Sequence, residues 1–126
     1  MNKATQKIQW LGECEPHNFP AALSYLTLIY PPAIAKGIVL KLRAARVVEF
    51  KAKDIFRASA LSLLGVSNSH VERDRKKIKR GEPLSPIMLV RDAANGKVVI
   101  ADGYHRLCAL YTFDEDALVR CKISDR

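Results

Sequence analysis

Apolar residues recur with two different spacings along the chain, and the change from one to the other predicts where a strand gives way to a helix. Residues 97–101 include a short continuous apolar run, which predicts a buried strand. Over 104–113 the apolar residues fall about one helical turn apart, which predicts a helix. Asp102 and Gly103 stand between the two patterns, where a glycine permits a sharp change of backbone direction.

The same rules predict the other elements. In chain order we expect helices over 21–30 and 33–45, a strand over 47–50, helices over 53–60 and 70–80, a strand over 87–91 paired with 97–101, the helix over 104–113, and a last strand over 118–123. Residues 26–30 also fit a strand. Pro20 suits a first helical turn, and Pro31-Pro32 ends that helix. Asn95-Gly96 predicts a hairpin turn.

Local signals also place the helix over 70–80. Residues 67–69 read as a loop, in which Asn68 or Ser69 can cap the helix, and Gly81 and Pro83 end it. His70 then stands at the helix start rather than in a binding site.

This order of elements predicts an α+β fold, with a small mixed sheet and flanking helices in a single domain. Residues 1–46 would form an N-terminal helical extension packed on a core of residues 47–126. Around the end of the first helix the chain is more apolar than one small helix needs, so these side chains either pack in the core or form a homodimer contact. They are Tyr25, Leu28, Ile29 and Tyr30.

Composition bounds the class of protein. The chain has 126 residues, 48% of them hydrophobic, and no apolar run long enough to span a membrane. Its start lacks the apolar stretch of a secretory signal. Cys14, Cys108 and Cys121 are odd in number and form no Cys-x-x-Cys pair, which indicates reduced thiols and a cytoplasmic location. Cys14 and His17 have the spacing of half a zinc site, but a second pair is missing, so we expect no metal site.

The chain carries a net charge of +8, which favours a polyanionic partner. Most of the excess lies in two blocks, over 36–57 and 73–80, and the second block also reads as a solvated helix face. Few aromatic residues interleave with these blocks, so stacking of single-stranded bases is poorly supported.

The junction at 102–106 has the chemistry of an anion site. A helix N-terminus offers unpaired N–H groups and a partial positive charge, and His105 and Arg106 add donors beside it. Phosphate suits such a place, and Gly103 would leave room for it. A plainer interpretation has Asp102 as a helix cap and both basic residues as solvated surface.

The run Asp102-Gly103-Tyr104-His105-Arg106, followed by Cys108-Ala109, resembles the signature of the ParB/sulfiredoxin superfamily. Residues 84–90 are similar to the strand that these families place before the signature, and 70–78 and 47–55 resemble the preceding helix and the first strand. The resemblance covers residues 47–123 and implies a ParB/sulfiredoxin-like core.

The resemblance also implies chemistry. Tyr104 occupies the position of the sulfiredoxin nucleophile, and a phenol cannot replace a thiolate, so sulfinic acid reduction is not expected. Cys108 should be a buried core residue. Gly103 and Arg106 match ParB residues that contact nucleotide phosphates, while Tyr104 and His105 depart from that pattern. ParB-like domains often bring a basic residue toward the nucleotide where Arg57 stands.

We therefore expect a nucleotide or another phosphate-bearing ligand, with Mg²⁺ as a companion cation, on Gly103, Tyr104, His105, Arg106 and Arg57. Whether phosphotransfer or hydrolysis follows stays open; Asp102 and His105 are the catalytic candidates, and Glu49 and Asp54 are further carboxylates. The alternative is a basic accessory protein of partition, plasmid or phage type that binds DNA without catalysis. The pocket interpretation predicts that Arg106→Ala weakens phosphate binding far more than Arg80→Ala.

Overall fold

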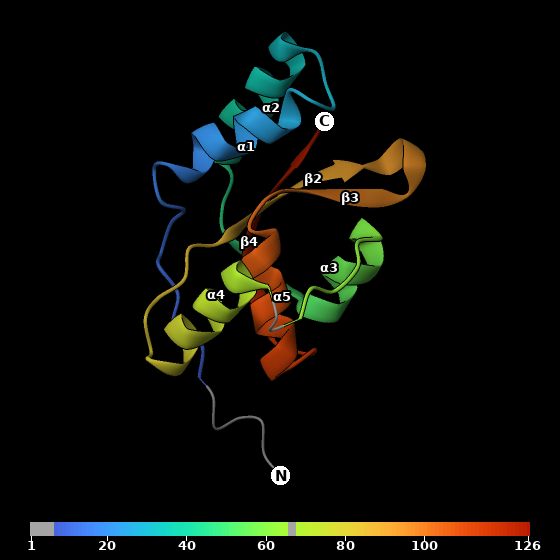
Figure 1. The fold of residues 1–126 in the computed structure, drawn as a ribbon. Helices are drawn as coiled ribbons and strands as arrows, with labels where there is room; N and C mark the ends of the chain where they lie inside the picture. Colours follow the sequence, from blue (N-terminus) through green and yellow to red (C-terminus); the bar gives the residue numbers. More distant parts are fainter. Residues whose placement is uncertain (1–6, 66–67) are drawn as a thin grey trace.

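A computed structural model describes residues 7–65 and 68–126 and confirms the predicted α+β class, with helices on both faces of a four-stranded mixed sheet (Figure 1). The elements are α1 (Asn18–Leu26), α2 (Pro32–Ala44), β1 (Val48–Lys51), α3 (Ala52–Ser59), α4 (Ser69–Lys79), β2 (Ile87–Asp92), the short 3₁₀ turn η2 (Ala93–Asn95), β3 (Lys97–Asp102), α5 (Tyr104–Phe113) and β4 (Leu118–Asp125).

The sheet has the order β1-β4-β2-β3. Strand β2 pairs antiparallel with β3 and parallel with β4, and β1 pairs antiparallel with β4. The predicted hairpin is confirmed, since η2 joins β2 to β3 and Gly96 adopts a φ of 64°. Because β2 is central, alternate side chains on it face opposite sides: Leu89 packs with one core cluster and Met88 with the other.

Each face of the sheet is covered by its own helices. Figure 1 shows α1 and α2 on one side, and α3, α4 and α5 on the other. The first side buries Ile38 and Leu42 of α2 against Met88 and Val90 of β2. The second side buries the apolar face of α5, including Leu107. The N-terminal helices therefore pack directly on the sheet, and α4 lies beside α5.

Helix α1 begins three residues before the predicted position and ends four residues early. Pro20 is its third residue, inside the first turn, where the missing N–H costs nothing. Residues 27–30 then form hydrogen-bonded turns rather than more helix or a strand. Tyr30 is buried, whereas Leu28 is 83% exposed and Ile29 is 45% exposed. Core packing thus accounts for Tyr30 alone, and the homodimer stays a prediction.

Helix α4 begins where local polar chemistry predicts. The Asn68 side chain accepts hydrogen bonds from the backbone N–H of His70 at 3.0 Å and of Val71 at 3.2 Å, so Asn68 rather than Ser69 is the cap. Residue 67 of the predicted loop lies outside the described residues. In the described part of the chain, no helix is both long and apolar enough to cross a membrane.

Candidate polar site at the start of helix α5

Strand β3 ends at Asp102 and α5 begins at Tyr104, so the predicted strand–turn–helix junction is present. Gly103 links them with a φ of 104°, which L side chains rarely adopt. A Cβ added to Gly103 would lie 2.3 Å from Cγ2 of buried Ile87 and 2.8 Å from Nη2 of Arg106. The glycine is therefore required by the protein's own packing, which is a different reason from the predicted approach of a phosphate.

Asp102 pairs with Arg106 rather than capping α5. Nη2 of Arg106 donates to Oδ2 of Asp102 at 3.0 Å and to the carbonyl oxygen of Pro86 at 3.3 Å. Both side chains are more than four-fifths buried. Among the residues that the structure describes, no side chain accepts a hydrogen bond from the start of α5, so the N–H groups of its first turn have no side-chain cap there. The charge of Arg106 is thus balanced within the protein.

The junction between β3 and α5, residues 102–106, lines a polar cavity of about 210 Å³. Its walls come from the loop before α1, from α4, from the segment before β2 and from the start of α5. The lining residues are Glu15, His17, Asn18, Arg73, Asp74, Lys77, Pro83, Leu84, Ser85, Asp102, Gly103, Tyr104, His105 and Arg106.

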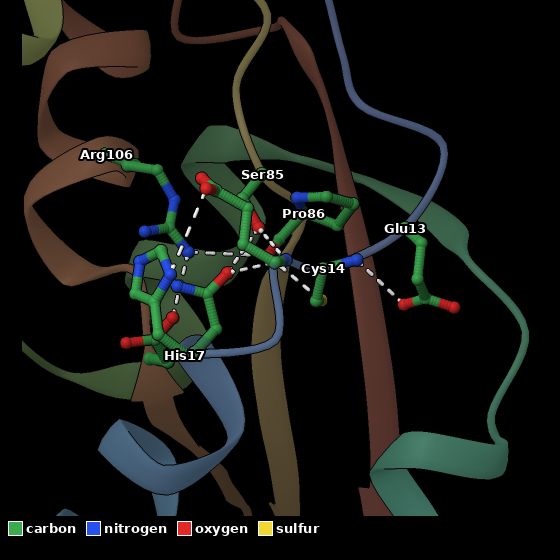
Figure 2. Close-up of polar contacts among 9 residues, drawn as sticks. Glu13, Cys14, His17, Ser85, Pro86 and Arg106 are labelled. Carbon is green, nitrogen blue, oxygen red and sulfur yellow. Dashed lines mark hydrogen bonds and ion pairs between the residues drawn. The ribbon is translucent and has the colours of Figure 1, made fainter.

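The loop before α1 is fixed to the segment before β2 by polar contacts (Figure 2). The Ser85 hydroxyl donates to Oδ1 of Asn18, and the backbone N–H of Glu15 donates to the same oxygen at 3.0 Å. The Cys14 thiol donates to the Pro86 carbonyl at 3.3 Å. Asn18 and Ser85 are only 4% and 3% exposed. This wall is therefore held in place by the fold.

Asp74 is the other buried polar residue of the cavity. It lies on α4, is 4% exposed and lines the space shared with the start of α5. Among residues 7–65 and 68–126 its carboxylate has no hydrogen-bond or ion-pair partner within bonding distance. Arg73 and Lys77, on the same helix and in the same cavity, likewise form no ion pair with the described residues.

His105 is packed between aromatic rings at the edge of the cavity. Its ring centroid lies 4.9 Å from that of His70 and 5.6 Å from that of Tyr104. Burial lowers the pKa of His105, and nearby His70 and Arg73 lower it further, against the opposing charge of Asp74. A neutral imidazole is therefore favoured at pH 7, which leaves His105 one N–H donor.

Tyr104 is oriented by a contact outside the predicted site. Its hydroxyl donates to the backbone carbonyl of Ser62. Burial raises the pKa of the Tyr104 phenol, with Cys108 adding to the shift. The phenol is thus a neutral, already bonded group, and what Tyr104 offers a ligand is its backbone N–H.

The structure does not bring the other predicted residues to this cavity. Arg57 lies on α3, with Nη1 3.8 Å from Oδ1 of Asp54, and neither residue lines the cavity. Glu49 lies on β1, 3.8 Å from Nε of Arg120. Within the described residues no group of three or more His, Cys, Asp or Glu side chains could hold a metal ion.

Sequence reasoning missed the side chains that complete the site. In the sequence Arg73 and Lys77 stand out only as part of a basic block, although their spacing of four residues places them on one helix face. Asn18, Asp74 and Ser85 carry no local signal. Comparisons with models of protein families, with curated proteins and with solved structures give no match. The ParB/sulfiredoxin resemblance therefore stays a prediction based on its motif.

Proposed function

We propose that the chain binds a compact phosphate-bearing ligand in the cavity between α4 and the start of α5. The observation that supports this most is the meeting of two independent anion-binding features in one space. Within the described parts of the chain, the first turn of α5 presents N–H groups without a side-chain cap, and Arg73 and Lys77 line the same cavity without ion-pair partners. Helix N-termini and unpaired cations both favour phosphate.

The cationic contribution comes from α4 rather than from Arg106. Arg106 is already bonded to Asp102 and to the Pro86 carbonyl, so its charge is balanced before any ligand arrives. Its role is to hold the junction between β3 and α5 in shape. The backbone N–H groups of Tyr104 and His105 then remain as donors at the site predicted from the sequence.

The size of the cavity limits what it encloses. Typical pockets for drug-sized ligands measure about 300–1,000 Å³, whereas this one measures about 210 Å³. The cavity suits a phosphate and the few atoms attached to it. A nucleotide would place its phosphate here and its base outside. A companion Mg²⁺ would draw most of its ligands from the phosphates and from water, as Mg²⁺ commonly does.

Catalysis of phosphotransfer at this site is a further step beyond binding. Phosphotransfer needs a positioned phosphate and a carboxylate that can accept a proton from the attacking hydroxyl. Asp102 is committed to Arg106, so it is poorly suited to that task. Asp74 has no such commitment and lines the cavity. If the protein is an enzyme, Asp74 rather than Asp102 is the carboxylate that fits a general base.

Two adjacent lysines on α4 provide a matched test. Lys77 lines the cavity, whereas Lys76 does not and lines only a neighbouring hollow along α4. We expect Lys77→Gln to weaken the binding of inorganic phosphate and ethyl phosphate by about ten- to hundredfold. Lys76→Gln should change it less than about threefold. Isothermal titration calorimetry at 150 mM salt measures both.

A second candidate function is binding of a nucleic acid along α4. Arg73 and Lys77 also line the hollow that contains Lys76 and Arg80, so one basic surface continues from the cavity along the helix. Such binding would be mostly electrostatic and would fall steeply with salt. Equal weakening by Lys76→Gln and Lys77→Gln, together with a steep salt dependence, would favour this function and reject the pocket.

A further inference from the structure

We infer that the ligand carries, within two or three atoms of its phosphate, a hydroxyl or ammonium group that donates a hydrogen bond to Asp74. The inference rests on the proposed function and names the second chemical group that the same cavity recognises. It predicts a class of ligand, the small phosphorylated alcohols and amines, or a larger molecule that ends in the same pair of groups.

The first observation is the burial of Asp74 without a partner. A carboxylate that has no hydrogen-bond or ion-pair partner in the protein is left to bond water or a ligand. Asp74 as a whole residue is 4% exposed, and in the described parts of the chain no hydrogen bond or ion pair reaches its carboxylate; the carboxylate oxygens are not among the fully buried unpartnered atoms, so they are open to the cavity. Because Asp74 lines the cavity, a ligand that enters can supply the missing donor.

The neighbours of Asp74 do not already fill this role. Arg73 and Lys77 line the same cavity, but neither forms an ion pair with the Asp74 carboxylate. His105 is close enough for its pKa to respond to Asp74, yet burial keeps that imidazole neutral. The Asp74 carboxylate thus shares its cavity with two cationic side chains and forms an ion pair with neither of them.

Asn18, another buried residue that lines the cavity, supports the same arrangement. Its Oδ1 accepts hydrogen bonds from Ser85 and from the backbone of Glu15, which fixes the orientation of the carboxamide. Its Nδ2 donates to no residue in the described ranges, although Asn18 is 4% exposed and lines the cavity. One cavity therefore holds several donors suited to phosphate oxygens and one buried acceptor suited to a hydroxyl or an ammonium group.

Three probes of equal carbon count test the inference. Ethyl phosphate lacks a second polar group, 2-hydroxyethyl phosphate adds a hydroxyl, and 2-aminoethyl phosphate adds an ammonium group. We expect wild-type protein to bind the hydroxyl or the amino probe at least tenfold more tightly than ethyl phosphate, as measured by calorimetry. The probe that binds more tightly shows whether the group that donates to Asp74 is a neutral hydroxyl or a charged ammonium group.

Asp74→Asn then tests the residue. The preferred probe should lose about tenfold in affinity, while ethyl phosphate should bind as well as before or better, since a negative charge has left the cavity. Glu82→Gln is the control, because Glu82 lies just beyond α4 and outside the cavity. Circular dichroism and thermal melting confirm that each variant folds.

The outcomes separate this inference from the proposed function. If folded wild-type protein binds all three probes equally, or if Asp74→Asn weakens all three to the same degree, the role of Asp74 is wrong and phosphate binding stands. If folded wild-type protein binds none of them, the proposed function is wrong. If Asp74→Asn fails to fold, the comparison of the three probes on wild-type protein still shows whether a hydroxyl or ammonium group strengthens binding.

Discussion

Nη2 of Arg106 lies 3.0 Å from Oδ2 of Asp102, one helical turn earlier in the chain. The same nitrogen donates to the Pro86 carbonyl, so Arg106 ties the β3–α5 junction to the segment that precedes β2. An arginine beside a helix N-terminus usually suggests direct contact with phosphate. Here the guanidinium is already paired, and its nearest anion is part of the protein.

Because Asp102 neutralises the charge of Arg106, we expect Asp102 to lower the affinity of the cavity for phosphate. We expect Asp102→Asn to lower the free energy of unfolding by about 1–3 kcal/mol, because a charge-assisted hydrogen bond is weakened. The same change should raise the affinity for ethyl phosphate by about threefold or more, because Arg106 then carries an unbalanced charge into the cavity. Urea unfolding and calorimetry measure the two effects.

The surface pair of Arg91 and Asp125 provides the control for that prediction. Its atoms lie 3.5 Å apart, and both side chains are more than half exposed. Asp125→Asn should cost less than about 1 kcal/mol and leave phosphate affinity unchanged. A loss of phosphate affinity in Asp102→Asn would mean that Asp102 itself helps to bind the ligand.

A substitution at Gly103 should destabilise the fold through two separate terms. The φ of 104° strains any L side chain, and a Cβ would overlap Cγ2 of Ile87. Gly81 has a φ of 74° but nothing within 4 Å of its added Cβ, so Gly81→Ala isolates the strain. We expect Gly81→Ala to cost about 1–2 kcal/mol and Gly103→Ala about 1–3 kcal/mol more, by urea unfolding. Equal costs would show that the Ile87 contact relaxes freely.

The elements that the sequence predicts correctly are those with local signals. Asn68 caps the helix that follows it, Asn95-Gly96 turns a hairpin, and Gly103 separates two spacings of apolar residues. Each signal acts within a few residues, so it can be recognised without knowledge of the fold. The same locality explains the error at 27–30, where apolar residues continue a helical pattern while the backbone turns toward Pro31.

The site is predicted only in part because its chemistry is assembled over long distances. Residues 102–106 can be predicted from the sequence because they form a contiguous motif. Asn18 and Ser85 are 67 residues apart in the chain, and their contact shapes the cavity wall. Asp74 resembles a surface acid between two arginines until α4 packs beside α5. Charge and residue type alone cannot distinguish such a residue from a solvated one.

Lys122 illustrates the same limit, and it leads to a prediction on stability. It lies on β4 at 1% exposure, donates to the Arg43 carbonyl at 2.9 Å and lies 2.8 Å from Oε1 of Glu13. Its Nζ lies 5.6 Å from the centroid of the Phe19 ring, and its aliphatic stem is buried with the rest of the side chain. We expect Lys122→Ala to cost about 2–5 kcal/mol because it leaves a cavity.

Lys122→Met retains most of the stem and should cost clearly less than Lys122→Ala in the same urea unfolding experiment. Both variants remove the contact to Glu13, which precedes the loop that forms one wall of the cavity. Equal costs for the two variants would show that the ammonium group, rather than the packed stem, provides the stability.

The three cysteines should behave as structural thiols. All are buried and free, and burial raises the pKa of Cys14 to about 11 and that of Cys121 to about 12. Burial also raises the pKa of Cys108. Since the thiolate is the reactive form, native protein at pH 8 should react slowly with an aromatic disulfide reagent, and protein in guanidinium should release all three equivalents. A rapidly reacting thiol in the native state would contradict this.

Cys108→Ser tests the same conclusion at the site. Cys108 is fully buried on α5, about one helical turn after Tyr104, which packs against the same core cluster. The variant should lose about 1–3 kcal/mol of stability because a hydroxyl replaces a buried thiol. It should bind ethyl phosphate within about twofold of wild type, since no role in binding is expected. Weaker binding by a fully folded variant would assign Cys108 a direct role.

His105 should make stability depend on pH in a defined direction. Its pKa in the folded protein is lowered, chiefly by burial, from the ordinary value near 6.5. Between the lowered value and 6.5 the unfolded chain therefore binds more protons than the folded one. Stability must then rise with pH through that window and fall as the solution becomes more acidic. Urea unfolding at pH 7.5 and 5.5 measures this change.

His105→Asn should reduce the loss of stability between pH 7.5 and 5.5, because the variant cannot take up that proton. His17→Asn is the matched control, since the His17 side chain is 73% exposed. The His17 variant should therefore follow wild type more closely than the His105 variant does. If wild type and His105→Asn lose the same stability on acidification, His105 titrates as it does in the unfolded chain, and its place between His70 and Tyr104 does not exclude water.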